Sequence, residues 1–383
     1  MRLDRRNVGR LVLAAALVFA VLVPQLHLTF GVLLPGPLDS VGSMNLLAIM
    51  LVAAATAVTL DIVFGYAGLL SLGHAVYFGV GCYSVVMFTG LASLDFPMAV
   101  LLAMLTTLLL SVIGNACALN LSGFGYAMAT LALVQLLAIF IERGYAGSGG
   151  EVGLTYSLGV LPDSFTGLVN TRHLYWLALG TLVVVYGLAR WAVSTQAGSI
   201  WQAIRENPLR AQVLGVNVYA YRLAAAAFGS FLAGVCGIVY SIVMGGANPS
   251  IVELTYSLGL ILMVVLGGRG VLWGAMLGGL LYTYLNLRLA SVATATGMQD
   301  LPDVLRVPLT QPKFLLGVVF VLVILFVPGG LASAVTARWR TRRVPATAQS
   351  PEPTTQPTKR ASDEGHEQPD TATGPEERVS TQP

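Results

Sequence analysis

Residues with the chemical variety to bind or react are rare in this chain, and the most informative group of them lies at 195–217, between two long apolar runs. Within it Asn207 is followed by Pro208, which is typical of a helix N-cap and of the first helical position after it. Gly215 predicts the end of that helix, because glycine readily takes the left-handed backbone that closes helices. The spacing therefore predicts a short helix that begins at Pro208 and stops at Gly215.

A second short helix is predicted just before it. Ser199, followed three residues later by Gln202, has the spacing of a capping box, which marks a helix start. The charges of Arg205, Glu206 and Arg210 make the segment too polar to cross a bilayer. Such a compact, charged, helical loop in an otherwise apolar chain is expected to dock a partner on an aqueous face of the membrane. The simpler alternative is a loop that is merely solvated.

Sequence patterns typical of enzymes are missing from the chain. There is no GxxxxGKS/T loop for the phosphates of ATP, no HExxH zinc motif and no CxxC pair. The glycine-rich stretch at 147–154 does not lie between a strand and a helix, so it predicts a turn rather than a nucleotide site. Cys82, Cys117 and Cys236 all lie in apolar runs and are interpreted as small buried residues. We expect no enzymatic activity, and no metal or cofactor bound by this chain.

The polar residues inside the apolar runs include Asp61, His74, Asn115 and Gln135. A charge in the middle of a bilayer costs about 2.5–3.5 kcal/mol on insertion scales, but Asp61 is near the end of its run. It is expected to face lipid headgroups or to cap a neighbouring helix. His74 is expected to be a hydrogen-bonded packing residue rather than a ligand. Asn115 and Gln135 are each expected to bridge helices through amide hydrogen bonds.

The composition explains why such residues are few. Of 383 residues, 56% are hydrophobic and 10% are charged, whereas soluble domains carry about 25% charged residues. Such a chain can bury its apolar surface only in lipid, so we expect an all-α, polytopic bundle of membrane helices. Runs of roughly 20 apolar residues give about ten candidate spans. They lie near 11–34, 43–64, 69–90, 96–120, 123–142, 173–193, 219–244, 255–268, 271–290 and 313–333. The eighth of them is short and is expected to be broken or re-entrant.

Basic residues mark one side of the predicted bundle as cytoplasmic. They are Arg2, Arg5, Arg6, Arg10, Arg205, Arg210, Arg222, Arg269, Arg338, Arg340, Arg342 and Arg343. With an even number of crossings, both ends of the chain are expected in the cytoplasm. The predicted organisation is a basic N-terminus (1–10), a transmembrane domain (11–335) with loop helices at about 196–216, and a tail (344–383). The tail is rich in Pro, Thr, Glu and Gln and is expected to be disordered.

Small residues spaced four apart predict where helices approach closely. The rows are Ser71, Ala75, Gly79; Gly229, Ala233, Gly237, Ser241; and Gly270, Gly274, Gly278. Each row is expected to pack on another helix, and the alternative is that a row also lines or gates a path.

Several stretches occur in an order that is specific as a set. They are GLLSLGHAVYFGVGCYS (68–84), GYAMATLALVQL (125–136), GSGGEVGL (147–154), AIRENPLRAQVLGVN (203–217), LMVVLGGRGVLWGAMLGGLL (262–281) and FVPGGL (326–331). Together they resemble the permease subunits of branched-chain amino acid ABC importers, of the LivM type. The resemblance covers about Leu46 to Leu331.

The resemblance implies a permease of a bacterial inner membrane that does not hydrolyse ATP itself. It implies a homologous second permease subunit of the LivH type, with the path between the two. It also implies two cytoplasmic ATP-binding subunits and an extracytoplasmic substrate-binding protein.

In this family a cytoplasmic helix-loop fits a cleft of the ATPase. The matching positions here are Ala203, Arg205, Glu206, Asn207, Arg210 and Gly215. The match to the wider coupling motif is loose, because no Glu-Ala-Ala precedes. The candidates for the path or its gate are Ser71, Gly73, His74 and Tyr77.

Two alternatives remain open at this point. The first keeps the class but changes the substrate, because related importers carry urea or short amides. The second is an ion-coupled secondary transporter, which usually needs ionisable residues at the bilayer midplane. The sequence offers few such residues, among them Asp61 near the end of its run and His74.

Overall fold

The computed structural model describes residue 37, residues 40–293 with short gaps at 93, 122, 158, 160 and 163–169, and residues 311–326 and 329–332. The chain divides into two units, Met1–Thr341 and Arg342–Pro383. All described residues lie in the first unit. The predicted basic N-terminus, the first predicted span and the predicted tail lie outside the described residues.

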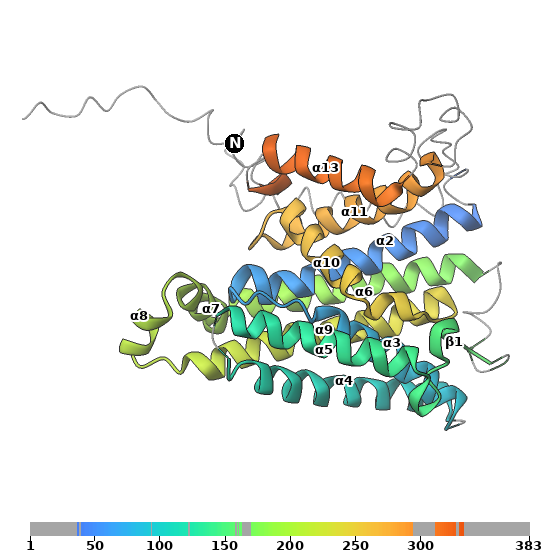
Figure 1. Ribbon diagram of the computed structural model, residues 1–383, viewed down its shortest axis with the longest axis horizontal. Coiled ribbons are helices and arrows are strands. Elements are labelled where there is room, and N and C mark those ends of the chain that lie inside the picture. The colour runs from blue at the N-terminus through green and yellow to red at the C-terminus, as the bar shows by residue number, and fades with distance from the viewer. Residues whose placement is uncertain are drawn as a thin grey trace, which may run out of the picture. The chain divides into compact units, whose positions relative to one another are not determined.

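The described part is built almost entirely of helices. In chain order they are α2 (Val41–Leu60) with its π-helical continuation η2 (Asp61–Tyr66), α3 (His74–Gly90), α4 (Phe96–Ala118), α5 (Phe124–Glu142), η3 (Tyr145–Gly147), η4 (Gly150–Val152), α6 (Thr171–Ser194), α7 (Gln196–Glu206), α8 (Pro208–Val213), α9 (Val218–Met244), η7 (Pro249–Val252), α10 (Leu254–Gly267), α11 (Leu272–Ala293) and α13 (Pro312–Phe326). Two short strands, β1 (Leu154–Thr155) and β2 (Gly246–Ala247), pair antiparallel. Figure 1 shows α7 and α8 at one end of the helices and β1 at the other.

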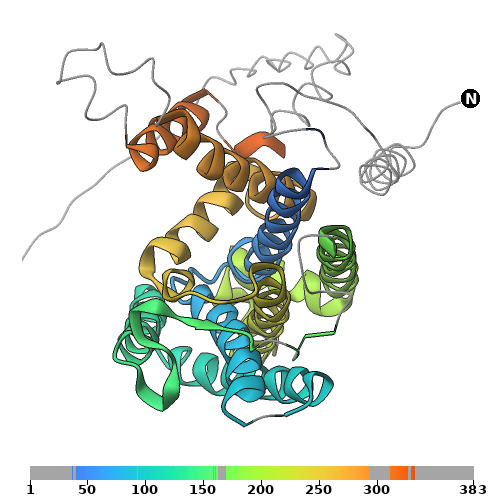
Figure 2. The ribbon, with the colours of Figure 1, turned by 90° about the vertical axis from the view of Figure 1, so that its right-hand side faces the viewer.

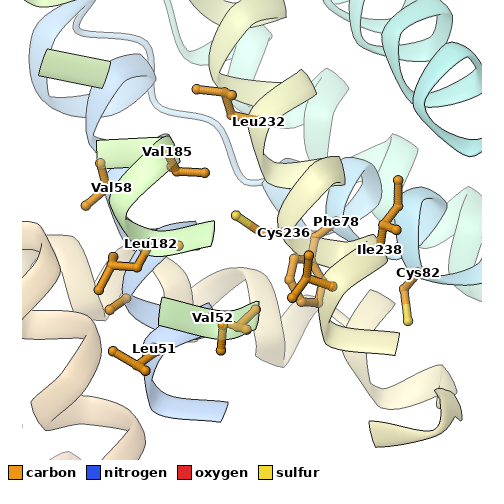
Figure 3. Close-up of a cluster of buried hydrophobic side chains, with 14 of the residues drawn as sticks. Leu51, Val52, Val58, Phe78, Cys82, Leu182, Val185, Leu232, Cys236 and Ile238 are labelled. Atoms are coloured by element: carbon orange, nitrogen blue, oxygen red, sulfur yellow. The ribbon is translucent and has the colours of Figure 1, made fainter. Parts of the chain in front are cut away.

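Helices α2, α3 and α9 form the centre of the bundle. Helix α9 packs on α2, α3, α4 and α6, an arrangement seen nearly end-on in Figure 2. Helix α2 also packs on α6 and α11, and α11 packs on α10 and α13. The buried side chains that meet between α2, α3, α6 and α9 include Val52, Phe78, Val185 and Cys236 (Figure 3). All four side chains are apolar, as expected in the core of a helix bundle.

Helix starts follow the capping residues of the sequence. Ser40 Oγ accepts the backbone N–H of Ser43 at 3.3 Å, at the start of α2. Asn217 Oδ1 accepts the N–H of Ala220 at 3.1 Å, at the start of α9. These contacts satisfy backbone donors that the first turn of any helix leaves without a partner.

Five described helices are long and apolar enough to cross a membrane, judged by length and composition alone: Val41–Tyr66, Phe96–Ala118, Phe124–Glu142, Thr171–Ser194 and Val218–Met244. Apart from the undescribed first one, every predicted span coincides with a helix. Helix α10 is short, as expected for the eighth span, and η7 comes directly before it. A helical membrane bundle is therefore established, whereas a total of ten spans stays a prediction.

The small-residue rows mostly lie where helices touch. A methyl group added to Gly237 on α9 would lie 1.9 Å from the carbonyl oxygen of Phe78 on α3. On α11, the same addition to Gly274 or Gly278 would meet backbone of α10. Two rows need correction at their first member: Ser71 lies before α3, and Gly270 lies in the turn before α11.

Two other expectations are wrong. Helix α7 begins at Gln196 rather than at Ser199, and the Ser199 hydroxyl donates to the Gln196 carbonyl at 2.7 Å. The capping box therefore does not form, because Ser199 is already inside the first turn. Cys117 is exposed, whereas Cys82 and Cys236 are buried as expected.

Candidate functional site

The charged segment of the sequence forms two short helices at one end of the bundle. Asn207 lies between α7 and α8, and its side chain accepts the N–H of Arg210 at 3.0 Å. Pro208 is the first residue of α8, and Gly215 has a φ of 83° after its last turn. The predicted cap, first position and stop of α8 are therefore confirmed.

One side of this segment is fastened to the bundle. Ile204 of α7 and Ala211 of α8 pack with Val218 at the start of α9 in a small buried cluster. The indole N–H of Trp201 donates to the carbonyl of Tyr221 at 2.9 Å. A side chain clamped by both apolar packing and a hydrogen bond holds α7 in a fixed position on α9.

The other side of the segment exposes apolar side chains. Leu209, Val213 and Leu214 are 71%, 88% and 82% exposed, and we call these three residues the α8 tip. Sequence reasoning selected the charged neighbours and missed them. The sequence could have indicated them, because the loop holds more apolar residues than the three that pack in the buried cluster, Ile204, Ala211 and Val218.

Arg205 reaches from α7 toward the bundle instead of away from it. Its guanidinium donates to the carbonyl oxygen of Gly65, in η2 at the end of α2. Two glycines leave room for it: a methyl group on Gly68 would lie 2.8 Å from Arg205 Cγ, and one on Gly270 would lie 2.9 Å from its Nη1. Arg205 therefore touches both the end of the first described span and the turn between α10 and α11.

Asp61, at the end of α2, makes a second contact with Gly270 from within the bundle. It is fully buried, and its Oδ1 accepts the backbone N–H of Gly270 at 2.7 Å. Because Gly270 precedes α11 by two residues, Asp61 fastens the turn before α11 rather than capping the first-turn N–H groups of that helix, and its burial excludes a contact with headgroups. The Arg269 guanidinium, in the same turn as Gly270, lies 5.2 Å from the centre of the Phe64 ring.

The remaining positions predicted to contact an ATPase differ in exposure. Ala203, Glu206 and Arg210 are exposed, and Asn207 is half-buried as the cap of α8. Gly215 is exposed, with nothing near the position of a side chain. These residues lie on α7, on α8 and in the turn after it, and Arg205, which is also exposed, differs from them in its bond to Gly65.

The four residues predicted for the path or gate are buried within this chain. Ser71, His74 and Tyr77 are 3%, 1% and 1% exposed. His74 Nε2 and Thr59 Oγ1 share a hydrogen bond of 2.9 Å, which links α3 to α2. Gly73 lies against the backbone of Thr130 on α5. Within the described chain these residues serve helix packing, and a path role stays a prediction.

The two amides inside the apolar runs have different surroundings. Asn115 on α4 accepts the Tyr126 hydroxyl of α5 at 2.8 Å and donates to Ser230 of α9 at 3.1 Å. It bridges three helices, as expected. Gln135 on α5 instead lies on the exposed side of its helix.

The described residues offer no site for a metal ion, since no three His, Cys, Asp or Glu side chains among them lie close enough together. The contacts that join the loop to the spans are made by Arg205, Asp61 and Gly270. The arrangement links α7 to the end of α2 and to the turn before α11.

Comparison with known proteins assigns this architecture to a family. Residues 42–343 match the model of the branched-chain amino acid transport system permease component. Because this match spans most of the chain, the protein belongs to that family of membrane permeases. No solved structure matches the chain.

Named relatives support the same assignment at low identity. The chain is 23% identical over 262 residues to the high-affinity branched-chain amino acid transport system permease protein LivM of Salmonella typhimurium, covering 63% of this chain and 62% of the relative. It is 27% identical over 316 residues to the probable branched-chain amino acid transport permease protein LivM of Methanocaldococcus jannaschii, covering 71% and 88%. It is also 27% identical over 177 residues to the nucleoside ABC transporter permease protein NupC of Lactococcus lactis, covering 44% and 53%. The chain thus spans less than two thirds of the length of the Salmonella relative, and it is a LivM-type permease by similarity.

Proposed function

We propose that this protein is the permease subunit of an ATP-driven importer of branched-chain or related aliphatic amino acids in a bacterial inner membrane, with both chain ends in the cytoplasm. A separate ATP-binding subunit would bind the α8 tip, and an extracytoplasmic binding protein would deliver the substrate. Family membership supports the permease role. The observation that carries the ATPase contact is the cluster of exposed apolar side chains on a rigidly capped loop helix.

The α8 tip has the character of the core of a protein interface. Covering a side chain such as leucine completely stabilises by about 1.5–3 kcal/mol, and the tip leaves three such side chains exposed. The exposed charges of Glu206 and Arg210 surround it, as polar rims surround the apolar centres of interfaces. A loop that was merely solvated would not need apolar residues at these positions.

The contacts of Arg205 supply a route from the ATPase to the spans. Closure of an ATPase pair shifts a population between two states of the permease, so the contacts of the docked helix must differ between them. Movement of α7 would pull directly on Gly65 and Gly270 through Arg205. Asp61 ties those two positions together, so the end of α2 and the start of α11 would move as one.

The ATPase contact is tested by a pair of matched substitutions. Val213→Asp, at an 88% exposed position of the tip, is expected to reduce co-purification of the ATP-binding subunit at least tenfold, because a carboxylate cannot enter an apolar cleft. Val152→Asp is the control, since Val152 is 91% exposed but lies beside β1 at the opposite end of the helices. Equal recovery of the ATPase with both variants would contradict the proposal.

The substrate is tested separately, by uptake into proteoliposomes that contain the complete complex and its binding protein. Uptake of leucine that requires ATP is the expected result, in line with the relatives named for branched-chain amino acids. ATP-dependent uptake of urea or of a nucleoside, without leucine uptake, would overturn the substrate while keeping the importer class. Uptake by this chain alone, driven by an ion gradient, would overturn the class.

A further inference from the structure

A cavity of about 600 Å³ lies between α6, η2 and the turn before α11. Its walls include Arg190 and Trp191 of α6, Tyr66 of η2, and Gly270 and Trp273 on the side of α11. Because α7 follows α6 directly, the cavity is at the end of the bundle that carries the charged loop. The proposed ATPase contact makes no use of it.

Arg190 gives this cavity a positive charge. It is exposed, and no acidic residue is among the described residues that line the cavity. Tyr66, Tyr186 and Ser194 also line it, and their hydroxyls can donate hydrogen bonds. Arginine bonds to phosphate through two parallel N–H groups. A guanidinium beside several hydroxyls therefore suits a phosphate group.

Two tryptophans of α6 indicate the level of the cavity in the membrane. Trp191, in the cavity wall, is 64% exposed, and Trp176, near the other end of the helix, is 41% exposed. They are about 22 Å apart along the helix, which suits the two aromatic belts of a span that faces lipid. Arg190, next to Trp191, is therefore at the level where the phosphates of lipid headgroups lie.

The exposed face of α6 continues from the cavity toward the middle of the span. Along it lie Gly180, Val183, Val184 and Gly187, at the three- and four-residue spacing that keeps residues on one face of a helix. A methyl group added to either glycine would have nothing within 4 Å. From Gly180 to Arg190 the helix rises about 15 Å, which is half of a hydrocarbon layer about 30 Å thick. One acyl chain can thus lie along this face while its phosphate contacts Arg190.

We propose that this cavity binds the headgroup of an anionic phospholipid, with the phosphate on Arg190 and one acyl chain along Gly180 and Gly187. A lipid is favoured over a soluble phosphate because the charged and aliphatic parts of the site are continuous along one helix. Basic pockets between membrane helices recognise such headgroups. The proposal requires a membrane bundle but does not depend on the ATPase contact.

Native mass spectrometry of the full-length protein in detergent, titrated with phosphatidylglycerol, tests the headgroup contact. We expect one lipid to bind more tightly than the rest, and Arg190→Gln to weaken its binding at least fivefold. Arg172→Gln is the matched control, because Arg172 is exposed near the opposite end of the same helix, and it is expected to change binding less than twofold. Equal binding by the two variants, or equal affinity of the unaltered protein for zwitterionic phosphatidylcholine, would overturn the proposal.

A second measurement tests the acyl-chain contact and separates a lipid from a free phosphate. Gly187→Leu is expected to block the path of the acyl chain and to lower phosphatidylglycerol binding at least threefold. Gly90→Leu at the end of α3, where an added methyl group also has nothing within 4 Å, is the control and is expected to leave binding unchanged. Inorganic phosphate at millimolar concentration is expected not to displace the lipid. Displacement by inorganic phosphate, or undiminished lipid binding by Gly187→Leu, would overturn the lipid assignment.

Discussion

At the scale of single residues, Arg205 makes a different contact in the structure from the one that its place in the sequence suggested. Its charge and its place in the loop suggested a contact with a partner, yet its guanidinium bonds to Gly65 and lies against Gly270. Arg210, five residues later, is exposed and lies beside the α8 tip. Arg205 thus contacts the spans although it is exposed, and Arg210 lies in the same exposed loop beside the tip.

The role of Arg205 is tested by separating association from transport. Arg205→Ala is expected to retain the ATP-binding subunit but to lower ATP-dependent uptake at least tenfold, because the link to Gly65 is lost. Arg210→Ala is the control for loss of a charge from the same loop, and uptake is expected to fall less than threefold. Uptake by Arg205→Ala at the level of the unaltered protein would show that the link does not transmit motion.

At the scale of elements, helix α8 depends on the backbone of Gly215. Its φ of 83° is open to glycine and, less readily, to asparagine, whereas proline is fixed near −65°. Gly215→Pro is therefore expected to insert normally while it uncouples ATP hydrolysis from uptake, because the orientation of the α8 tip changes. Gly215→Asn is expected to retain coupling, measured as substrate imported per ATP hydrolysed. Equal amounts of substrate imported per ATP hydrolysed in both variants would show that transport does not depend on the geometry of α8.

Helices α3 and α9 depend on glycine in a different way. Gly237→Ala is expected to lower the melting temperature of the purified protein, because its methyl group would lie 1.9 Å from the Phe78 carbonyl oxygen. Gly180→Ala on α6 has nothing within 4 Å of the added methyl group. It is expected to leave the melting temperature unchanged or to raise it, since alanine is favoured over glycine in a helix by about 0.8–1.0 kcal/mol. A lower melting temperature for Gly180→Ala but not for Gly237→Ala would contradict the expectation that Gly237 is the position of close helix packing.

At the scale of the whole molecule, the proposed ATPase contact requires that the end of the bundle that carries the α8 tip faces the cytoplasm. The α8 tip and β1 lie at opposite ends of the helices (Figure 1). In inverted membrane vesicles, a single cysteine at Val213 is expected to react with a membrane-impermeant thiol reagent, and one at Val152 only after the vesicles are opened. Cys117, which is exposed, is first replaced by serine. The reverse pattern would place α8 outside and exclude an ATPase contact.

Much of the architecture could be predicted from the sequence because lipid permits few solutions. A run of apolar residues long enough to cross the membrane must be helical, since its backbone groups have no water to bond with. The ranges of α2 to α6 and of α9 followed from this rule, as did the short α10. The cap at Asn207 and the stop at Gly215 followed from local backbone chemistry. Ser199 failed as a cap because the helix could begin a turn earlier.

The sequence by itself determined the membrane class, the family and the place of the polar loop, because composition, run length and ordered motifs are properties of the chain read in one dimension. Only the tertiary structure decided that Arg205 bonds to Gly65, that Asp61 bonds to Gly270, and that Asn115 is buried while Gln135 is exposed. Those outcomes depend on which helix faces which. In an apolar bundle that choice is set by the shapes of surfaces that residue types alone do not distinguish.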